Sequence, residues 1–282
     1  MQYGTHLFAT ERSIQPAEFA SASEERGFES VWFSEHTHIP VKFLTSGKRN
    51  PPLPEYYWQT YDPFIASTLA ATATTNIRIG TGISLVIEHD TIALAKTVAT
   101  IDQVSSGRFI FGVGAGWLAE EMENHGVNYR TRFRLISEQI SAMKSIWSEE
   151  ESEFRGEFVN FNKMKSFPKP RQNPHPSIIG GGGAGPKTLD FIVNHCDGWM
   201  PILRYPDWPK LKAGITDLHQ RALEMEREPE SIELSIFCWS PPDKQTVDEM
   251  ESLGVKKIVI SLEGKQREEA LPLLDQYAGL VS

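Results

Sequence analysis

The stretch that decides the fold runs from Ile79 to Trp117 and reads IGTGISLVIEHDTIALAKTVATIDQVSSGRFIFGVGAGW. Two strand-like runs at its ends each carry a glycine pattern, and a helix-length segment joins them. A strand, a helical crossover and a second strand form a parallel pair. The glycines leave bare backbone at the carboxyl ends of the strands, where parallel α/β proteins bind flat cofactors. The stretch therefore predicts a parallel sheet with a ligand site at one edge.

Similar units continue in both directions along the chain. We expect strands at 3–8, 30–34, 77–83, 108–113, 177–180, 198–202, 233–239 and 257–262. Helical patterns lie at 16–26, 62–74, 91–105, 131–148, 186–195, 206–227, 245–253 and 266–279. Eight alternating units predict an α/β fold closed into a (β/α)8 TIM barrel, with residues 1–282 as one domain. An open doubly wound sheet is the structural alternative.

Two segments interrupt this alternation. Residues 35–61 form a long loop after the second strand, rich in proline and aromatic residues. Loops of this length are uncommon unless they have a function. Residues 153–170 have the pattern of a small hairpin before the fifth strand.

Composition excludes several classes of partner. The net charge is −9 and no run of lysine or arginine forms a basic stripe, so we expect neither a nucleic-acid nor a membrane partner. Cys196 and Cys238 lack the spacing of a disulfide framework or a zinc site, so no metal is expected. The first residues lack a signal-peptide pattern and no apolar run is long enough to span a membrane, which predicts a cytoplasmic protein.

The glycines after the fifth strand are the best candidate for an anion site. Gly182, Gly183, Ala184 and Gly185 lie between a strand and a helix that opens with proline. Free backbone N–H groups and the positive end of that helix favour a phosphate there, and Lys187 adds charge. The competing interpretation is a flexible turn, but four consecutive glycines exceed what a turn needs.

Other strand ends allow more than one interpretation. Alternating glycines at 112, 114 and 116 either receive a planar ring or let a helix pack closely, and Gly82 indicates a bulge in the third strand. His36, beside Glu35, either exchanges a proton with a ligand or binds within its own loop. Carboxylates near strand ends also leave a glycosidase open, although no pattern pairs them.

In this order, four motifs resemble the luciferase-like flavin and deazaflavin oxidoreductases. They are SVWFSEH at 30–36, IRIGTGIS at 77–84, IDQVSSGRFIFGVGAGW at 101–117 and DGW at 197–199. The segments EHTHIP and GVGAGWLAEEMENHGV are similar to a branch described as probable coenzyme F420-dependent oxidoreductases. The resemblance spans nearly the whole chain and implies a luciferase-like barrel that binds a flavin-type ring at the carboxyl ends of its strands.

The resemblance also implies roles for individual residues. A cis peptide at Gly82–Ile83, followed by Ser84, would support the ring, and the segment Ala115, Gly116 and Trp117 would flank it. The loop from Gly182 to Gly185 would bind the phosphate of the side chain. His36 falls where deazaflavin dehydrogenases place an active-site histidine, and Glu35 where they place an acidic cofactor contact. Trp117 stands where the sugar-phosphate dehydrogenases carry a catalytic glutamate, which favours a more apolar substrate.

These features predict an enzyme that uses coenzyme F420 to move a hydride to or from a small organic substrate, with His36 and Glu35 as catalytic residues. One alternative keeps the fold and uses FMN and oxygen as a monooxygenase. Another is a protein that binds the flavin-type molecule without turnover. The apolar stripe of the helix at 131–148 is compatible with the core or with a homodimer interface.

Overall fold

The computed structural model describes residues 1–45, 48–49, 51–204 and 207–281. In these residues a parallel barrel is formed by β1 (Gln2–Leu7), β2 (Ser30–Phe33), β5 (Arg78–Thr81), β6 (Phe109–Val113), β9 (Ser177–Gly181), β10 (Gly198–Met200), β12 (Glu233–Cys238) and β13 (Val255–Ser261). The strands pair in chain order, β13 returns to β1, and β10 pairs with β12. The predicted (β/α)8 barrel is therefore confirmed, and the open sheet is not observed.

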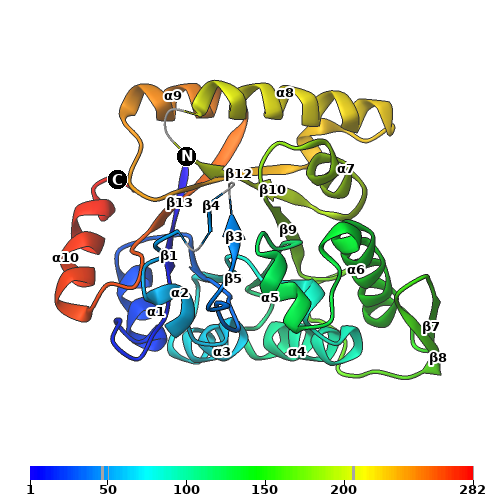
Figure 1. The fold of residues 1–282 in the computed structure, drawn as a ribbon. Coiled ribbons are helices and arrows are strands. Elements are labelled where there is room, and N and C mark those ends of the chain that lie inside the picture. The colour runs from blue at the N-terminus through cyan, green and yellow to red at the C-terminus, as the bar shows by residue number, and fades with distance from the viewer. Residues whose placement is uncertain (46–47, 50, 205–206, 282) are drawn as a thin grey trace.

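Helices surround the barrel strands (Figure 1). They are α1 (Pro16–Glu25), α3 (Pro63–Ala73), α4 (Thr91–Val104), α6 (Arg132–Ser148), α7 (Pro186–His195), α8 (Trp208–Glu224), α9 (Lys244–Ser252) and α10 (Arg267–Ala278). Each predicted helix is present with small shifts at its ends. The predicted strand at 198–202 ends instead at Met200, and β11 (Ile202–Leu203) continues beside β12 after Pro201, which has no N–H for the ladder. Among the described residues, no helix is long and apolar enough to cross a membrane.

Short insertions cover the carboxyl ends of the strands. The described part of the loop at 35–61 forms β3 (Leu44–Thr45), β4 (Lys48–Arg49) and α2 (Tyr56–Gln59), and α5 (Ala119–Asn124) follows β6. The Leu44 N–H donates to Glu120 Oε1 at 2.8 Å, which links β3 to α5. The predicted hairpin before the fifth strand is confirmed as β7 (Ser152–Arg155) paired antiparallel with β8 (Asn160–Met164). It lies beside α6 (Figure 1).

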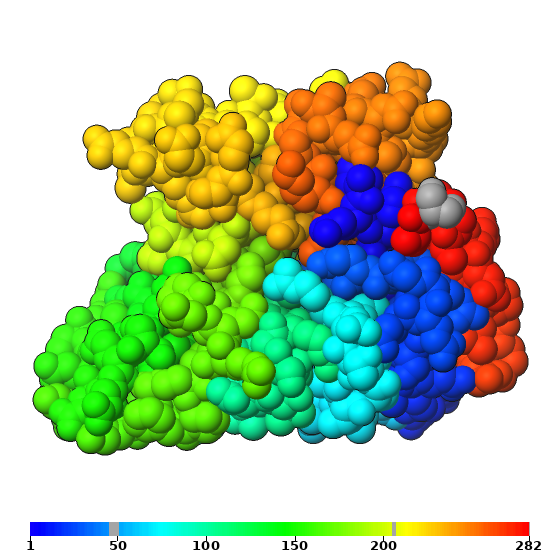
Figure 2. All heavy atoms as spheres, turned by 180° about the vertical axis from the view of Figure 1, so that it is seen from behind, coloured from blue at the N-terminus to red at the C-terminus, as the bar shows by residue number. Residues whose placement is uncertain are grey.

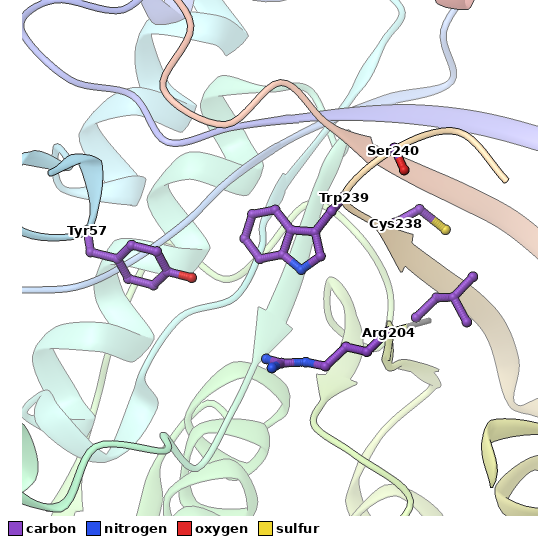
Figure 3. A pocket seen from close by; sticks show the side chains of 6 residues that line it. Tyr57, Arg204, Cys238, Trp239 and Ser240 are labelled. Atoms are coloured by element: carbon purple, nitrogen blue, oxygen red, sulfur yellow. The ribbon is translucent and has the colours of Figure 1, made fainter. Parts of the chain in front are cut away.

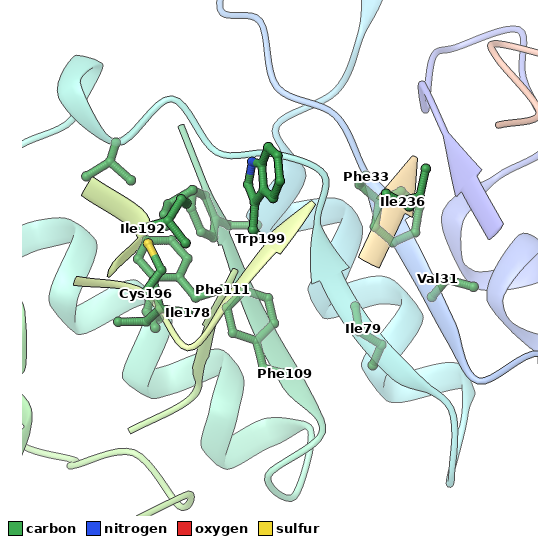
Figure 4. Packing of buried hydrophobic residues seen from close by; sticks show 14 of the residues in the cluster. Val31, Phe33, Ile79, Phe109, Phe111, Ile178, Ile192, Cys196, Trp199 and Ile236 are labelled. Atoms are coloured by element: carbon green, nitrogen blue, oxygen red, sulfur yellow. The ribbon is translucent and has the colours of Figure 1, made fainter. Parts of the chain in front are cut away.

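Side-chain alternation along the strands makes two apolar cores. Val31 and Phe33 of β2 point outward into the layer between strands and helices, whereas Trp32 points into the barrel. Figure 4 shows part of the outer layer, in which Phe111 and Ile178 pack near Ile192 and Cys196. The barrel interior is filled by a smaller set of side chains. These are Trp32, Ile110, Ile179, Met200, Phe237 and Val259.

Glycines of β5 and β6 make room for this interior. A Cβ on Gly80 would lie 2.4 Å from the Trp32 ring, and a Cβ on Gly112 would lie 1.8 Å from the Thr81 carbonyl oxygen. Both approaches are closer than van der Waals contact allows. Gly112 therefore permits the close approach of the neighbouring strand β5, and no helix of the described residues packs on it as the sequence allowed.

The amino-terminal end of the barrel is closed by charges. The ammonium of Lys257 is buried, 3.0 Å from Glu29 Oε2 and 3.4 Å from Glu233 Oε1. The N-terminal ammonium lies 3.0 Å from Glu251 Oε1. Figure 2 shows the N-terminal residues from behind, next to the C-terminal helix. The charges at this end of the barrel therefore stabilise the fold, and a ligand site is expected at the other end.

A fully buried histidine ties the barrel interior to the opposite end. The His6 ring binds the Ser261 hydroxyl at 3.0 Å and the Ser34 hydroxyl at 2.7 Å. The Ser34 hydroxyl also lies 3.1 Å from the Gly82 carbonyl oxygen. Burial lowers the pKa of His6 to about 3, so the ring is neutral at physiological pH.

This neutral histidine should make the protein acid-sensitive. Below the ordinary pKa of histidine, His6 binds a proton in the unfolded chain but not in the folded protein. The free energy of unfolding therefore falls as pH decreases toward 3. Between pH 7 and about pH 5, His6 should account for a loss of about 2 kcal/mol in the free energy of unfolding. We expect His6→Asn to lower stability at pH 7 but to lack this acid-dependent loss, as measured by urea unfolding at both pH values. An equal loss in both proteins would contradict the assignment.

Candidate active site

Four predicted site segments follow four neighbouring strands. The order β9, β6, β5 and β2 in the sheet places side by side the segments 182–185, 115–117, 82–84 and 35–36, each at a strand's carboxyl end. Because parallel strands point their carboxyl ends to one edge, these segments form one continuous rim. The sequence-predicted site residues are therefore gathered at one mouth of the barrel.

The bulge after β5 forms the middle of this rim. The peptide bond Gly82–Ile83 is cis, as the family resemblance implies. The strand resumes at Ser84, whose N–H donates to the Gly112 carbonyl at 2.8 Å and whose carbonyl accepts from Gly114 N–H at 2.9 Å. The Ser84 side chain itself is buried. The bulge thus offers backbone rather than the Ser84 hydroxyl to the mouth.

The Ile83 side chain explains two further glycines. A Cβ on Gly114 would lie 2.1 Å from Ile83 Cδ1, and a Cβ on Gly181 would lie 2.5 Å from the same atom. Neighbouring strands β6 and β9 therefore leave a slot that only glycine provides. The isoleucine fills the slot and fixes the bulge from below. The glycine pattern thus stabilises the Gly82–Ile83 bulge through the packing of Ile83.

His36 is held by a carboxylate from another element. Its Nδ1 lies 2.9 Å from Oε2 and 3.1 Å from Oε1 of Glu121, in the first turns of α5. Since a carboxylate only accepts, Nδ1 carries the hydrogen and the other nitrogen, Nε2, is left to exchange a proton. The His36 side chain is 6% exposed, and the rings of Tyr57 and Trp117 lie 5.4 and 5.9 Å from it.

Both carboxylate oxygens of Glu35, which the resemblance implies as a cofactor contact, are engaged within the protein. Its Oε2 accepts from the Leu85 N–H at 2.6 Å and its Oε1 lies 2.7 Å from His89 Nε2. Burial lowers the pKa of His89, but the hydrogen bond and the charge of Glu35 together raise it above its ordinary value. Both oxygens are engaged and only 3% of the side chain is exposed, so the geometry favours a positioning role for Glu35.

A third glutamate completes a buried acidic cluster. The Glu88 side chain is 1% exposed, and neither oxygen has a hydrogen-bond partner among the described residues. Its Oε2 lies 3.5 Å from His125 Nε2. Burial, reinforced by the charges of Glu121 and Glu35, raises the pKa of Glu88 to about 9. Glu88 is therefore a neutral acid at physiological pH.

The flank of the rim after β6 combines packing with an open aromatic face. Ala115 is buried, and Gly116 has a φ of +67° and a would-be Cβ 2.5 Å from Met122 Cε. Trp117, in contrast, is 39% exposed. The backbone of Ala115 and Gly116 is therefore fixed, while the Trp117 indole presents an apolar wall beside His36.

The loop after β9 has the form of an anion cradle. A Cβ on Gly183 or Gly185 would meet no atom within 4 Å, so the backbone there is open. Gly185 is the N-cap of α7 without a side-chain cap, and exposed Lys187 lies in the first turn. Uncapped amides at a helix N-terminus favour a phosphate. These residues and the bulge together fit a cofactor with a planar ring and a phosphate.

Sequence reasoning missed a cavity on the opposite side of the mouth. Its volume is about 420 Å³, and Tyr57, Arg204 and Trp239 point toward one another around it (Figure 3). Leu203, Cys238 and Ser240 complete the described lining. The aromatics at 56–61 were the available signal in the long loop. Arg204 had none, since a single arginine after a strand is common.

The comparisons with known proteins agree with this architecture. A family model described as luciferase-like monooxygenase matches residues 9–255. An uncharacterized protein of Mycobacterium tuberculosis (strain ATCC 25618 / H37Rv) is 34% identical over 99% of this chain and 98% of its own. An FMNH2-dependent dimethylsulfone monooxygenase of Pseudomonas putida is 40% identical, over 45% of this chain and 35% of its own.

One solved structure aligns over the full length. It is an F420-dependent secondary alcohol dehydrogenase in complex with an F420-acetone adduct, with a TM-score of 0.76 over 100% of this chain and 99% of the other. The sequence identity is 17%, so the likeness establishes the fold alone. The similar proteins thus include both deazaflavin and flavin enzymes.

Proposed function

The chain belongs to the luciferase-like monooxygenase family, and from this premise we propose that it is a coenzyme F420-dependent oxidoreductase. It moves a hydride between the deazaflavin ring and a carbon of a small organic substrate. The observation that carries the proposal is the pair of His36 and Glu121 beside the open face of Trp117. Hydride transfer to or from a carbonyl carbon requires a proton partner at the oxygen, and this pair supplies one.

The rim supplies the binding groups. Backbone of the Gly82–Ile83 bulge would support the ring, and Ala115 to Trp117 would flank it. The loop from Gly182 to Gly185, with Lys187, would hold the phosphate, and the free amides there are those before Gly185, whose N–H donates to the Gly183 carbonyl at 2.7 Å. The bound deazaflavin provides the hydride donor or acceptor. The protein provides orientation, because the bulge and the cradle follow strands fixed by the same sheet.

His36 performs the proton transfer in this scheme. Glu121 binds Nδ1–H, which fixes the ring and its tautomer. His36 then donates a proton from Nε2 to a carbonyl oxygen during reduction, or accepts one from an alcohol during oxidation. Glu35 holds the Leu85 backbone N–H and the His89 ring in place behind the bulge. Trp117 excludes water from one side of the reacting atoms.

An FMN-dependent monooxygenase is the second candidate. It is favoured by the family description and by the Pseudomonas putida relative that depends on FMNH2. The same rim accepts either ring, since it contacts the ring through backbone. The proton-exchanging pair of His36 and Glu121 favours the dehydrogenase over the oxygen-activating enzyme.

A binding titration separates the two candidates. We expect the purified protein to bind coenzyme F420 at least about tenfold more tightly than FMN, measured by cofactor fluorescence. Gly183→Asp should weaken F420 binding by about tenfold or more, because it places a carboxylate in the open cradle. It should leave the phosphate-free ring analogue, 8-hydroxy-5-deazariboflavin, unaffected.

The matched control is Gly183→Asn, which has the same shape without the charge. It should retain most of the F420 affinity. Tight FMN binding without F420 binding, followed by oxygen-dependent turnover of reduced FMN, would establish the monooxygenase instead. Equal effects of the two variants would show that the cradle does not hold the phosphate.

A further inference from the structure

The cavity at Arg204 adjoins the candidate active site. Tyr57 lines it, and the Tyr57 ring lies 5.4 Å from the ring of His36. Its volume of about 420 Å³ lies in the range of small-molecule sites. The cavity lies at the ends of β11 and β12, and β10 separates β12 from β9, the strand that precedes the phosphate cradle. Because Tyr57 joins the cavity to His36, a molecule in the cavity would approach His36 from the side of Tyr57.

The cavity has a flat apolar wall. Trp239 stacks on Phe8 with the ring planes 6° apart and the centroids at 6.3 Å. The Tyr57 ring lies 5.0 Å from Phe8, and Phe237 supports Trp239 edge-on at 5.2 Å. Aromatic faces held in this way bind flat apolar groups by stacking and burial. The Ser240 side chain adds one small polar group to the lining.

The two ends of the cavity differ in charge. Arg204 is the cation of the lining, and no carboxylate of the described residues lies within ion-pair distance of it. Its charge lowers the pKa of Tyr57, against the larger effect of burial and the smaller effect of Glu263, and Figure 3 shows both side chains directed into the cavity. The acidic cluster of Glu35, Glu88 and Glu121 lies beyond His36. An anion is thus attracted to Arg204 and repelled from the cluster.

We propose that this cavity is the substrate subsite and that it takes an organic carboxylate with a flat apolar body. The Arg204 guanidinium binds the carboxylate with its paired N–H groups, and Tyr57 and Trp239 cover the faces of the body. The uncharged end of the substrate then points toward His36. That the bound acid is a substrate rests on the proposed oxidoreductase function, whereas its binding depends only on the cavity.

The test uses trans-cinnamate as the probe and cinnamyl alcohol as its uncharged counterpart. Calorimetry with the full-length protein should show cinnamate bound at least about tenfold more tightly than the alcohol. Arg204→Met should weaken cinnamate binding by about 10–100-fold and leave the alcohol unchanged. Arg204→Lys should recover part of the affinity, because it restores charge without the paired donors. Arg171→Met, at an exposed arginine before β9, is the matched control.

Two results would overturn the proposal. One is equal affinity for the acid and the alcohol, or equal effects of Arg204→Met and Arg171→Met. The other is evidence that the anion bound by Arg204 is the acidic tail of the cofactor. If Arg204→Met lowers the affinity for coenzyme F420 tenfold and leaves cinnamate binding unchanged, Arg204 binds the acidic tail of the cofactor and not the substrate. Failure of the proposed function is distinguishable, because it would appear as absent F420 binding in a protein that still binds cinnamate.

Discussion

Replacing His36 by asparagine should reduce turnover by about 10²–10⁴-fold, the usual contribution of a positioned acid or base. Asparagine retains a polar side chain but cannot exchange a proton. In the proposed site the ring and the phosphate bind to backbone at the bulge and at the cradle, so F420 affinity should stay within about threefold. The rate of cofactor reoxidation by the best carbonyl acceptor of the wild-type protein measures the first quantity, and a fluorescence titration the second.

Two variants in α5 show whether Glu121 acts through His36. Glu121→Gln keeps the length of the side chain and removes the charge that holds Nδ1–H, so turnover should fall by about tenfold or more. Glu123→Gln changes an exposed glutamate of the same helix and should have no effect. If both substitutions acted equally, or if His36→Asn abolished cofactor binding along with turnover, the proton-transfer role of His36 would have to be abandoned.

The barrel was predictable because its periodicity is local. Each strand and each helix is recognisable from a few consecutive residues. The common closed fold of eight alternating units is the (β/α)8 barrel. The bulge was predictable for the same reason, since Gly82 interrupts an apolar strand. The division of the sixth strand by Pro201 and the short elements α2, β3 and β4 were missed, because short irregular segments have weak periodicity.

The pairs that build the site were beyond sequence reasoning. Glu121 lies 85 positions from His36 along the chain, and its place after the glycine pattern indicates a helix surface. Only the closed barrel brings α5 over the end of β2. The burial of Glu88 was not predictable either, since a glutamate in a turn is ordinarily solvated. Its burial follows from the packing of the elements on either side of the turn, which no local pattern specifies.

The glycines at the strand ends have two different structural roles. A bare strand end is compatible with a ligand or with a neighbouring side chain, and the sequence does not separate the two. In the structure Gly114 and Gly181 receive Ile83, whereas Gly183 and Gly185 remain open. The first pair holds the bulge from inside the barrel, and the second pair leaves an open surface before α7, where we propose that the phosphate binds.

The second large effect concerns the buried acid. Glu88→Gln should raise the free energy of unfolding by about 4–5 kcal/mol at about pH 8 and by almost nothing at about pH 4. The pKa of folded Glu88, about 9, lies above that of the unfolded chain. The folded state thus keeps a proton that the unfolded state releases, so stability is lost as pH rises from the ordinary glutamate pKa toward 9. Glutamine mimics the neutral acid and removes this loss.

Urea unfolding of both proteins across this pH range measures the difference directly, and Glu123→Gln again serves as the exposed control. A stability gain of the same size at both pH values would show that Glu88 is already ionised in the folded protein. The result also bears on the site, because an ionised Glu88 would place a third negative charge beside Glu121 and Glu35. A neutral Glu88 leaves the charge of Glu121 committed to His36, which is the arrangement that proton transfer at Nε2 requires.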